Sequence, residues 1–249
     1  MAELPDRRPI APEATAGQYT LPAGELACLT QAARDCRYLL ARGYPRTASL
    51  TLVGNRYQLS AAVREILRRG VFPPAVARQH RRKLVPLAAL RGRPLALDGH
   101  NVVLTLECAR RGIPVVAADD GFIRDIGRLS RNHRPTATTL AVVAELARCL
   151  SQHAVAAVQV WYDAPMSGSG DLAARTQEIF LAAGLEATAQ AVPVPEVRLA
   201  ASGGAVASSD TQLIAACRQL VDIAGEIIRS DPALPVIVLR PQRQKTLTV

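Results

Sequence analysis

From about residue 94 onward, short apolar segments alternate with longer amphipathic ones, and this alternation limits the fold more than any other feature of the sequence. The longer segments repeat with the period of a helix, whereas the short ones are nearly continuous in apolar residues, as buried strands of a parallel sheet are. The expected strands are 95–97, 114–118, 155–162 and 205–207, with an edge strand at 185–192, and the expected helices are 101–111, 136–150, 171–183 and 211–229. The sequence therefore predicts an α/β sandwich around a parallel sheet over residues 94–240.

The residues before this segment, 24–93, predict a small all-helical domain. Apolar residues recur there at helical spacing, and glycine or proline interrupts the pattern between the helices. The expected helices are 25–40, 46–53, 60–70 and 74–90. Short helices with basic outer faces resemble nucleic-acid-binding bundles in architecture, although any three-helix bundle has the same pattern.

The two ends of the chain lack such patterns. Residues 1–23 contain four prolines and little periodicity, which predicts a loose N-terminal arm. Residues 241–249 are polar and basic, and we expect them to form a frayed tail.

The excess positive charge lies in the first third of the chain. Residues 1–95 carry 16 Lys and Arg against 6 Asp and Glu, whereas residues 96–249 carry 14 against 15. Clustered cations gain free energy by releasing the counterions of a polyanion, so the split predicts a nucleic-acid-binding module beside a near-neutral one. A solvated helical surface is the alternative.

The sequence predicts neither a membrane segment nor a secretion signal. No uncharged apolar run reaches the roughly 18 residues of a membrane helix, and the first residues contain no apolar signal segment. The five cysteines are widely spaced, which predicts free, mostly buried thiols. We therefore expect a cytoplasmic protein with no membrane partner. The sequence leaves the oligomeric state open, and a homo-oligomer is compatible with it.

Aspartates follow the expected strands. Asp98 ends the first strand, Asp119 and Asp120 the second, Asp163 the third, and Asp210 follows the strand before the last long helix. Ligands of open parallel sheets bind at the carboxyl ends of the strands, so these carboxylates are expected to converge there. Clustered carboxylates raise each other's pKa unless a cation joins them, and ligands that are all oxygen favour Mg²⁺ or Mn²⁺.

A single aspartate at such a position also has a purely structural interpretation. It can cap a helix or stabilise a turn, and we favour that role for Asp119. For Asp98, Asp163 and Asp210 taken together, the sequence favours a shared metal site. His100 follows the first strand as well, and a solvent-facing imidazole is the simpler expectation for it.

Three motifs make residues 94–230 resemble the PIN-like nucleases, in particular their NYN branch. The motifs are Asp98-Gly99-His100-Asn101, Tyr162-Asp163-Ala164-Pro165 and Ser208-Ser209-Asp210. The resemblance implies a three-layer α/β/α sandwich whose aspartates bind Mg²⁺ or Mn²⁺ and hydrolyse RNA. It assigns the metal to Asp98, Asp163 and Asp210, and the orientation of a ligand or phosphate to Asn101. Asp120, at another acidic strand end, joins these four as a catalytic candidate.

The whole chain also resembles a prokaryotic two-part family of unknown function. In that family, a helical region with the signatures Arg-Gly-Tyr-Pro (residues 42–45) and Val-Gly-Asn-Arg-Tyr-Gln-Leu (residues 53–59) precedes a domain with Asp-Asp-Gly-Phe-Ile-Arg-Asp (residues 119–125). This resemblance spans more of the chain than the first, and it implies no particular activity.

Two elements of the second domain are candidates for phosphate binding. The loop from Ser167 to Gly170 offers backbone N–H groups before a helix and the hydroxyls of Ser167 and Ser169, although a flexible loop is an equal alternative. Arg124 follows a strand-end aspartate and is expected either to neutralise phosphate charge or to pair with Asp120 or Asp125.

Further candidates for substrate binding are Ser209, beside the last acidic strand end, and the basic run Arg81-Arg82-Lys83. Three consecutive residues of a helix point in different directions, so one or two phosphate contacts are the most that this run is expected to make.

The leading hypothesis is a metal-dependent phosphodiester hydrolase that acts on RNA, which we expect to bind in preference to DNA. The chief alternative is a binding module in which the sandwich has no catalytic role. A phosphatase or phosphotransferase ranks last, because the turn after Asp98 lacks the second aspartate of the common aspartyl-phosphate motif. Aromatic residues make up only 4% of the chain, which favours contacts to the RNA backbone over base stacking.

Overall fold

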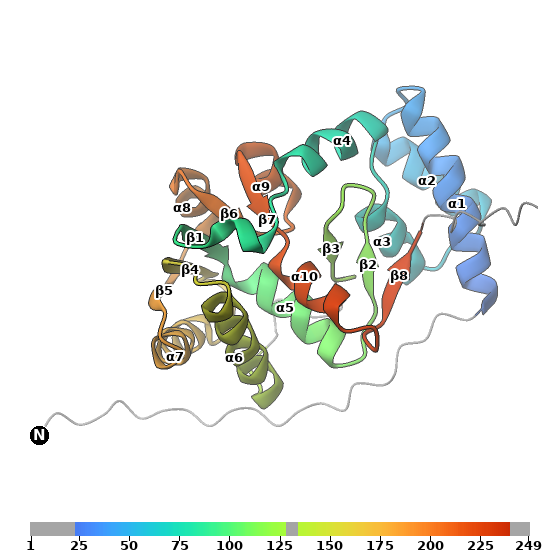
Figure 1. The fold of residues 1–249 in the computed structure, drawn as a ribbon. Coiled ribbons are helices and arrows are strands. Elements are labelled where there is room, and N and C mark those ends of the chain that lie inside the picture. The colour runs from blue at the N-terminus through green and yellow to red at the C-terminus, as the bar shows by residue number, and fades with distance from the viewer. Residues whose placement is uncertain (1–22, 128–133, 240–249) are drawn as a thin grey trace, which may run out of the picture.

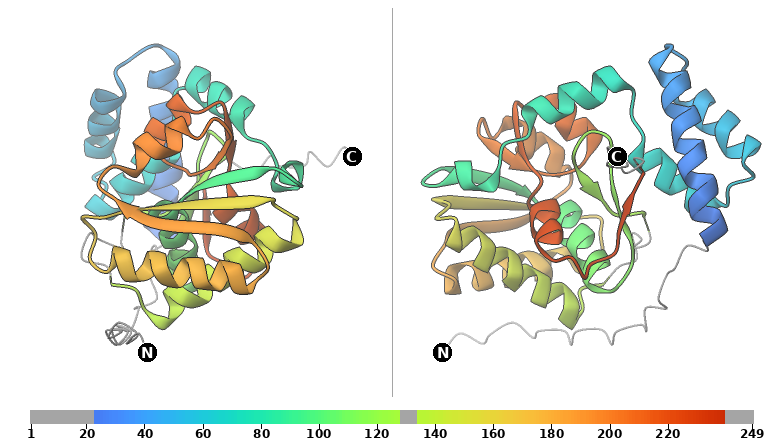
Figure 2. Two further views of the ribbon diagram at one scale, coloured as in Figure 1. Left: turned by 90° about the vertical axis from the view of Figure 1, so that its left-hand side faces the viewer. Right: turned by 45° about the vertical axis from the view of Figure 1, so that its right-hand side comes forward.

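The computed structural model describes residues 23–127 and 134–239. Within them a helical region precedes an α/β sandwich, and a second, smaller sheet lies between the two (Figures 1 and 2). The predicted N-terminal arm, apart from residue 23, and the predicted tail lie outside the described residues.

The helical region contains the helices α1 (Ala23–Ala41), α2 (Arg46–Arg56), α3 (Ala61–Gly70) and α4 (Pro74–Lys83). These four helices confirm the predicted helical region. The last helix is shorter than predicted, because the chain leaves it at Leu84, which forms a β-bridge with Leu220. It then makes the 3-10 turn η1 (Leu87–Leu90) after Pro86.

The larger sheet has five strands, all parallel, in the order β5-β4-β1-β6-β7. The strands are β1 (Pro94–Asp98), β4 (Ala157–Asp163), β5 (Glu186–Val192), β6 (Ala205–Ala207) and β7 (Gln219–Val221). From β1 the chain adds β4 and β5 on one side, and later β6 and β7 on the other. The strand order therefore reverses between β1 and β6, and such a reversal opens a crevice at the carboxyl ends of the strands.

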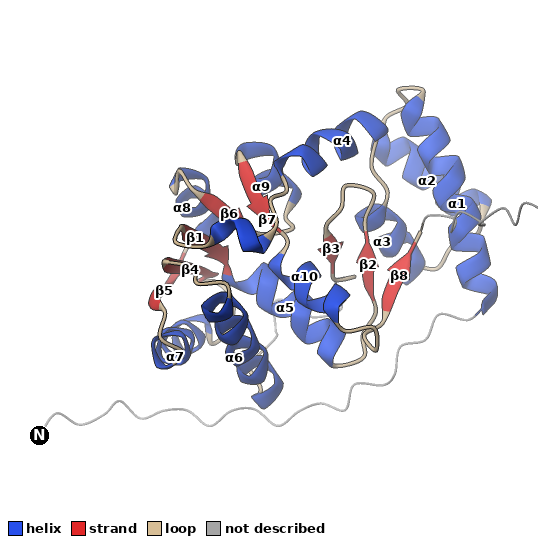
Figure 3. Cartoon of the chain, in the orientation of Figure 1, coloured by secondary structure: helices blue, strands red, loops and turns tan. Residues whose placement is uncertain are grey.

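Helices cover both faces of this sheet, which confirms the predicted α/β class (Figures 2 and 3). The helices α5 (Gly99–Arg110), α6 (Ala137–Gln152) and α7 (Ser169–Ala182) cover one face, and α8 (Pro195–Ala201) and α9 (Thr211–Ala216) lie over the other. Thr136 caps α6, as predicted: its hydroxyl accepts a bond from the Thr139 N–H, and the Thr139 hydroxyl accepts one from the Thr136 N–H.

The predicted second strand does not belong to this sheet. The prediction that all the acidic strand ends share one sheet edge is therefore wrong for Asp119 and Asp120. The strand forms β2 (Val115–Ala117) of a separate sheet in the order β3-β2-β8, with β3 (Ile123–Arg124) and β8 (Val236–Val238). The tight turn after β2 returns the chain as antiparallel β3, and β8 fills the other edge. Asp119 and Asp120 lie in that turn.

The helix predicted over residues 211–229 is also interrupted. It divides into α9, the buried strand β7, and α10 (Ile223–Ser230). Leu220 and Val221 pair with β6 and are fully buried, and the carboxylate of Asp222 then caps α10 by accepting a bond from the Gly225 N–H. The apolar residues of β7 continue the helical spacing of the residues around them, although they form a strand of the sheet.

The helical region and the small sheet share one hydrophobic core. Leu29 and Leu67 from the helices lie in the same buried cluster as Val116 of β2 and Leu239. A Cβ atom at Gly70 would lie 2.5 Å from Leu239 Cδ1 and 2.9 Å from Val116 Cγ2, so the end of α3 meets the sheet without room for a side chain. Removing the helices would expose this core.

Two further predictions concern the whole chain. All five cysteines are free, three of them are buried, and only Cys28 is exposed, which confirms the predicted free thiols. None of the helices in the described parts of the chain is both long and apolar enough to cross a membrane.

Candidate anion-binding site

The crevice between β1 and β6 brings together two of the predicted motifs. Asp98 ends β1, and its carboxylate accepts a hydrogen bond of 2.8 Å from the hydroxyl of Ser208, which follows β6. The other carboxylate oxygen caps α5 by accepting the N–H of Asn101 at 3.3 Å. Asp98 thus joins two strand ends that are 110 residues apart.

The glycine after Asp98 is required by packing. Gly99 begins α5 against the ring of Tyr162 on the neighbouring strand, and a Cβ atom there would lie 2.4 Å from Tyr162 Cε1. The Tyr162 ring is itself fixed, because its hydroxyl is hydrogen-bonded to that of Thr176 at 2.8 Å. The Asp-Gly pair therefore lets the helix start directly at the end of the strand.

The carboxyl of Asp98 titrates near neutrality. Burial, with a smaller contribution from the charges of Asp210 and Glu196, raises the pKa of Asp98 to about 7, and the hydrogen bonds from Ser208 and Asn101 oppose this shift.

Asn101 ties the start of α5 to the end of β6. Its side-chain oxygen accepts the backbone N–H of Ser209 at 2.8 Å and the Ser209 hydroxyl at 3.0 Å. The backbone donor fixes which end of the amide is oxygen. The amide nitrogen of Asn101 makes no hydrogen bond to any described residue.

Arg124 connects the small sheet to the same point. Its Nε donates to the Ser209 carbonyl at 2.8 Å, and its two terminal nitrogens donate to the two carboxylate oxygens of Asp120, both at 2.8 Å. Of the two pairings predicted for Arg124, the structure therefore has the one with Asp120, whereas Asp125 pairs with Arg69 at 3.1 Å.

Asp120 is fully buried within a chain of polar contacts. His80 Nδ1 lies 2.9 Å from its second oxygen. Burial by itself would raise the pKa of Asp120, but the hydrogen bonds and charges of Arg124 and His80 outweigh burial and hold the pKa below its ordinary value. Asp120 is thus an anchor for Arg124, and it does not line the pocket described next.

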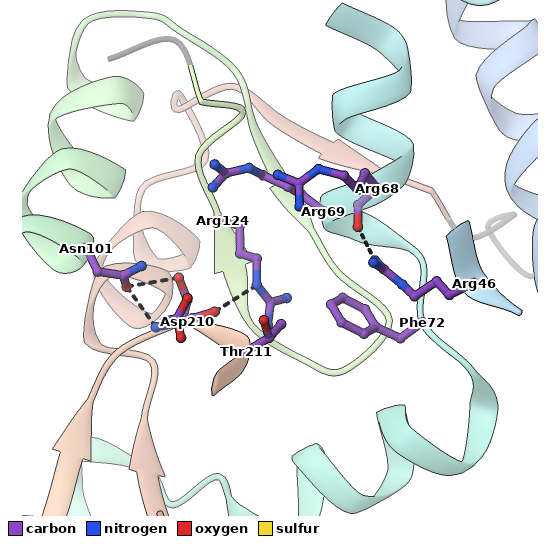
Figure 4. A pocket seen from close by; sticks show the side chains of 9 residues that line it. Arg46, Arg68, Arg69, Phe72, Asn101, Arg124, Asp210 and Thr211 are labelled. Atoms are coloured by element: carbon purple, nitrogen blue, oxygen red, sulfur yellow. Dashed lines mark hydrogen bonds between the residues drawn. The ribbon is translucent and has the colours of Figure 1, made fainter. Parts of the chain in front are cut away.

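A polar pocket of about 140 Å³ opens where the helical region, the small sheet and the crevice meet. We call it the arginine pocket. Its lining residues are Arg46, Arg68, Arg69, Phe72, Asn101, Arg124, Ser209, Asp210 and Thr211. Figure 4 shows these side chains around the opening, with Arg124 between Asp210 and Phe72. The lining thus contains four arginines and one carboxylate.

The charges of three of these arginines are already paired. Arg68 and Arg69 share the carboxylate of Glu65, and Arg124 has Asp120. Arg46 differs, because within the described residues no carboxylate pairs with it.

The guanidinium of Arg46 is held in the pocket by neutral partners. One terminal nitrogen donates to the carbonyls of Arg68 and of Val71, the latter at 3.1 Å, and the group stacks over the Phe72 ring, with Cζ 4.8 Å from the ring centroid. Its Nε is buried and has no hydrogen-bond partner among the described residues. Burial lowers the pKa of Arg46, and the charges of Arg68 and Arg124 lower it further. The site therefore holds a partly buried cation that forms no ion pair with a carboxylate of the described residues.

The three predicted metal ligands are not gathered into one site. Asp98 is engaged as described above, and one oxygen of Asp210 caps α9 by accepting the N–H groups of Gln212 and Leu213 at 2.8 and 3.1 Å. Asp163 ends β4, on the other side of β1 from Ser208, and its N–H donates to Nδ1 of the buried His100 at 3.0 Å. No group of three or more His, Cys, Asp or Glu side chains in the described ranges is placed to hold a metal ion.

The predicted phosphate loop lies elsewhere. Ser167 is exposed and Ser169 is buried, with its hydroxyl donating to the carbonyl of Asp163 at 2.7 Å. Neither serine lines the arginine pocket.

The basic run of α4 also lies outside the pocket. Arg81 donates to the carbonyl of Asp119, and Nζ of Lys83 donates to the carbonyls of Ile214 and Ala215 at 2.6 and 2.9 Å. Arg82 is exposed. Two of these three cations therefore connect α4 to the rest of the fold.

Sequence reasoning found Asn101, Arg124, Ser209 and Asp210 but missed Arg46 and Phe72 as parts of a site. Both lie in the basic first third of the chain, and Arg46 directly follows the Arg-Gly-Tyr-Pro signature. The charge split was the only signal for Arg46, and it could not single out one arginine, whereas nothing in the sequence marked Phe72 as part of a site.

Comparisons with known proteins cover both halves of the chain. The family described as Domain of unknown function (DUF5616) matches residues 87–226, and the one described as Protein of unknown function (DUF434) matches residues 28–83. Uncharacterized protein MJ0935 of Methanocaldococcus jannaschii is 28% identical over 202 residues, which are 80% of this chain and 96% of that protein. No solved structure matches.

Proposed function

The chain belongs to the family described as Domain of unknown function (DUF5616), and from its own site we propose that it binds RNA by holding a backbone phosphate in the arginine pocket. The carrying observation is Arg46, a partly buried guanidinium with an unpartnered Nε and no carboxylate partner among the described residues. Burying a charge without a counter-charge is costly, so a ligand that brings an anion to Arg46 binds with favourable free energy.

The donors of the pocket suit phosphate. A guanidinium offers a planar fork of N–H groups that matches the oxygens of a phosphate, and the amide nitrogen of Asn101 adds a neutral donor. The pocket also lies beside the strand-order reversal, where open parallel sheets bind their ligands. Residues 1–95 carry far more net positive charge than is required to neutralise a single phosphate. The charge split of the sequence therefore favours a long polyanion over a small acid as the ligand.

A metal-dependent hydrolase remains a prediction. Among the residues that were expected to hold Mg²⁺ or Mn²⁺, Asp98 has both oxygens and Asp210 has one oxygen hydrogen-bonded within the fold, and no three-ligand group is present in the described part of the chain. Incubating labelled RNA with the protein and Mn²⁺, against EDTA and against Asp98→Asn, tests it. Cleavage that needs both the metal and Asp98 would establish the hydrolase.

The binding proposal is tested by fluorescence anisotropy with a labelled RNA over a range of salt concentrations. Arg46→Ala should weaken binding by about tenfold or more and reduce the slope of log affinity against log salt by about 0.7 to 0.9, the value for one phosphate. Arg46→Lys, which keeps the charge but loses the fork, should recover part of the affinity. Arg148→Ala, which removes an exposed arginine of α6 outside the pocket, is the matched control and should change little.

A second variant changes the charge of the pocket while it keeps the hydrogen bonds that hold Asn101 in the fold. Asn101→Asp keeps an oxygen for the two bonds from Ser209 and adds a negative charge to the pocket lining. It should lower RNA affinity by at least as much as Arg46→Ala. Equal affinity and equal salt slope in wild type, Arg46→Ala and Asn101→Asp would contradict the proposal.

A further inference from the structure

Resting on the proposed RNA binding, we propose that two exposed tyrosines, Tyr38 and Tyr44, stack on unpaired bases, so that the ligand is single-stranded RNA. We call Arg34, Tyr38, Arg42 and Tyr44 the tyrosine strip. The proposal depends on the exposure of the rings, their cationic neighbours and their closeness to Arg46.

The rings of the strip face solvent, although aromatic side chains are scarce in this protein. Tyr38 is 58% exposed and Tyr44 is 56% exposed. Among the other described tyrosines, Tyr162 is fully buried and Tyr57 is partly buried, with its hydroxyl donating to Asp35 at 2.7 Å. Low aromatic content favours contacts to the RNA backbone over stacking, but the fold exposes two of its few aromatic rings, six residues apart in the chain.

Cations accompany the exposed rings. Arg34, Tyr38 and Arg42 are four residues apart at each step, so they follow one face of α1 and its end. The guanidinium of Arg42 lies over the Tyr38 ring, with Cζ 4.5 Å from the ring centroid. Neither Arg34 nor Arg42 pairs with a carboxylate of the described residues. Aromatic faces interleaved with unpaired arginines suit bases linked by phosphates.

The strip leads to the arginine pocket. Tyr44 precedes Arg46 by two residues, so their Cα atoms are at most about 7 Å apart. The bonds from Arg46 to the carbonyls that end α3 hold the start of α2 against the pocket wall. Figure 1 shows the turn between α1 and α2 at the same end of the helices as the beginning of α4. A strand with a phosphate at Arg46 can therefore place a neighbouring base on Tyr44.

The exposed rings select the kind of nucleic acid. A double helix hides the faces of its bases, whereas a single strand offers every base for stacking. The strip therefore favours unpaired RNA over a duplex of the same sequence. A protein-binding role for these tyrosines is the alternative, and the tyrosine variants would then bind RNA like the control variant.

The experiment compares Tyr38→Ala and Tyr44→Ala with Leu52→Ala, a control that removes a non-aromatic side chain of α2 that is 60% exposed. Three probes are used: a labelled single-stranded RNA, the same RNA annealed to its complement, and inorganic polyphosphate, which has charge but no bases. Each tyrosine variant should lose about 5- to 150-fold in affinity for the single strand, with unchanged salt slope and unchanged polyphosphate binding. Tyr→Phe at either position keeps a stacking ring and should restore the affinity.

The outcomes separate this inference from the binding proposal. If RNA binds and Arg46→Ala weakens it, but the tyrosine variants bind like Leu52→Ala, the tyrosine strip is not a stacking surface and the pocket stands. Equal losses on polyphosphate, or tighter binding of the duplex than of the single strand, would also overturn the inference. If the wild type binds no RNA at all, both proposals fall.

Discussion

Arg124 and Asp120 form a buried, two-pronged ion pair, with both hydrogen bonds 2.8 Å long. Arg124 lies on the small sheet, and its Nε reaches the carbonyl of Ser209 at the end of β6. His80 of α4 also contacts the carboxylate of Asp120, at Oδ2. One carboxylate thus connects the helical region, the small sheet and, through Arg124, the larger sheet. The pair places a guanidinium at the pocket wall and keeps it there.

Asp120→Asn should destabilise the fold, because it leaves the buried guanidinium of Arg124 without its counter-charge. Loss of one partner of a buried pair costs about 3 to 5 kcal/mol. Urea denaturation measures the change in the free energy of unfolding. Asp231→Asn removes one of the two carboxylate partners of Arg110, the other being Glu145, in a partly exposed pair, and it should leave stability nearly unchanged. Equal midpoints for both variants would show that Asp120 is not an anchor.

The pH dependence of stability should carry the signature of Asp98. The folded protein keeps this proton up to about pH 7, whereas the unfolded chain releases it near the ordinary pKa of about 3.9. Between these two values the folded state binds more protons, so the contribution of Asp98 to stability decreases as pH rises, by at most about 1.4 kcal/mol per pH unit. Above pH 7 the loss is complete.

Asp98→Asn removes this titration. The stability of the variant relative to wild type should therefore increase from pH 5 to pH 7.5, as measured by denaturant unfolding at several pH values. Parallel profiles for the two proteins would show that the buried carboxyl of Asp98 has an ordinary pKa.

Gly99→Ala tests the junction between β1 and α5. The added methyl would overlap the Tyr162 ring, so we expect a loss of about 1 to 3 kcal/mol. Gly170→Ala is the matched control in the first turn of α7, since a Cβ atom there has nothing within 4 Å. It should be neutral or stabilising, by up to about 1 kcal/mol. Similar thermal shifts in both variants would contradict the packing argument.

Much of the larger sheet could be predicted from sequence, because its strands are short apolar runs separated by helices with clear stop signals. The alternating pattern of residues 185–192 correctly predicted an edge strand, which the structure has at 186–192, and Thr136 correctly predicted the start of α6. The Asp-Gly-His-Asn and Ser-Ser-Asp motifs led to the crevice because both follow strands of one parallel sheet.

The small sheet and the arginine pocket could not be predicted from sequence, because both depend on tertiary contacts. A three-residue apolar strand such as β2 has the same sequence pattern in either sheet, and only its pairing with β8, more than 100 residues later, decides between them. The arginine pocket likewise joins Arg46, Phe72, Arg124 and Ser209, which no sequence motif connects. The sequence does not distinguish a partly buried arginine from an exposed one, so Arg46 could be recognised only from its surroundings in the structure.

A crystal structure of the protein with a short single-stranded RNA tests the central claim most directly. We predict a phosphate group in the arginine pocket, within hydrogen-bond distance of the Arg46 guanidinium and the Asn101 amide nitrogen. RNA bound to the protein with its phosphates elsewhere, and with no RNA atom in contact with Arg46, would contradict the account.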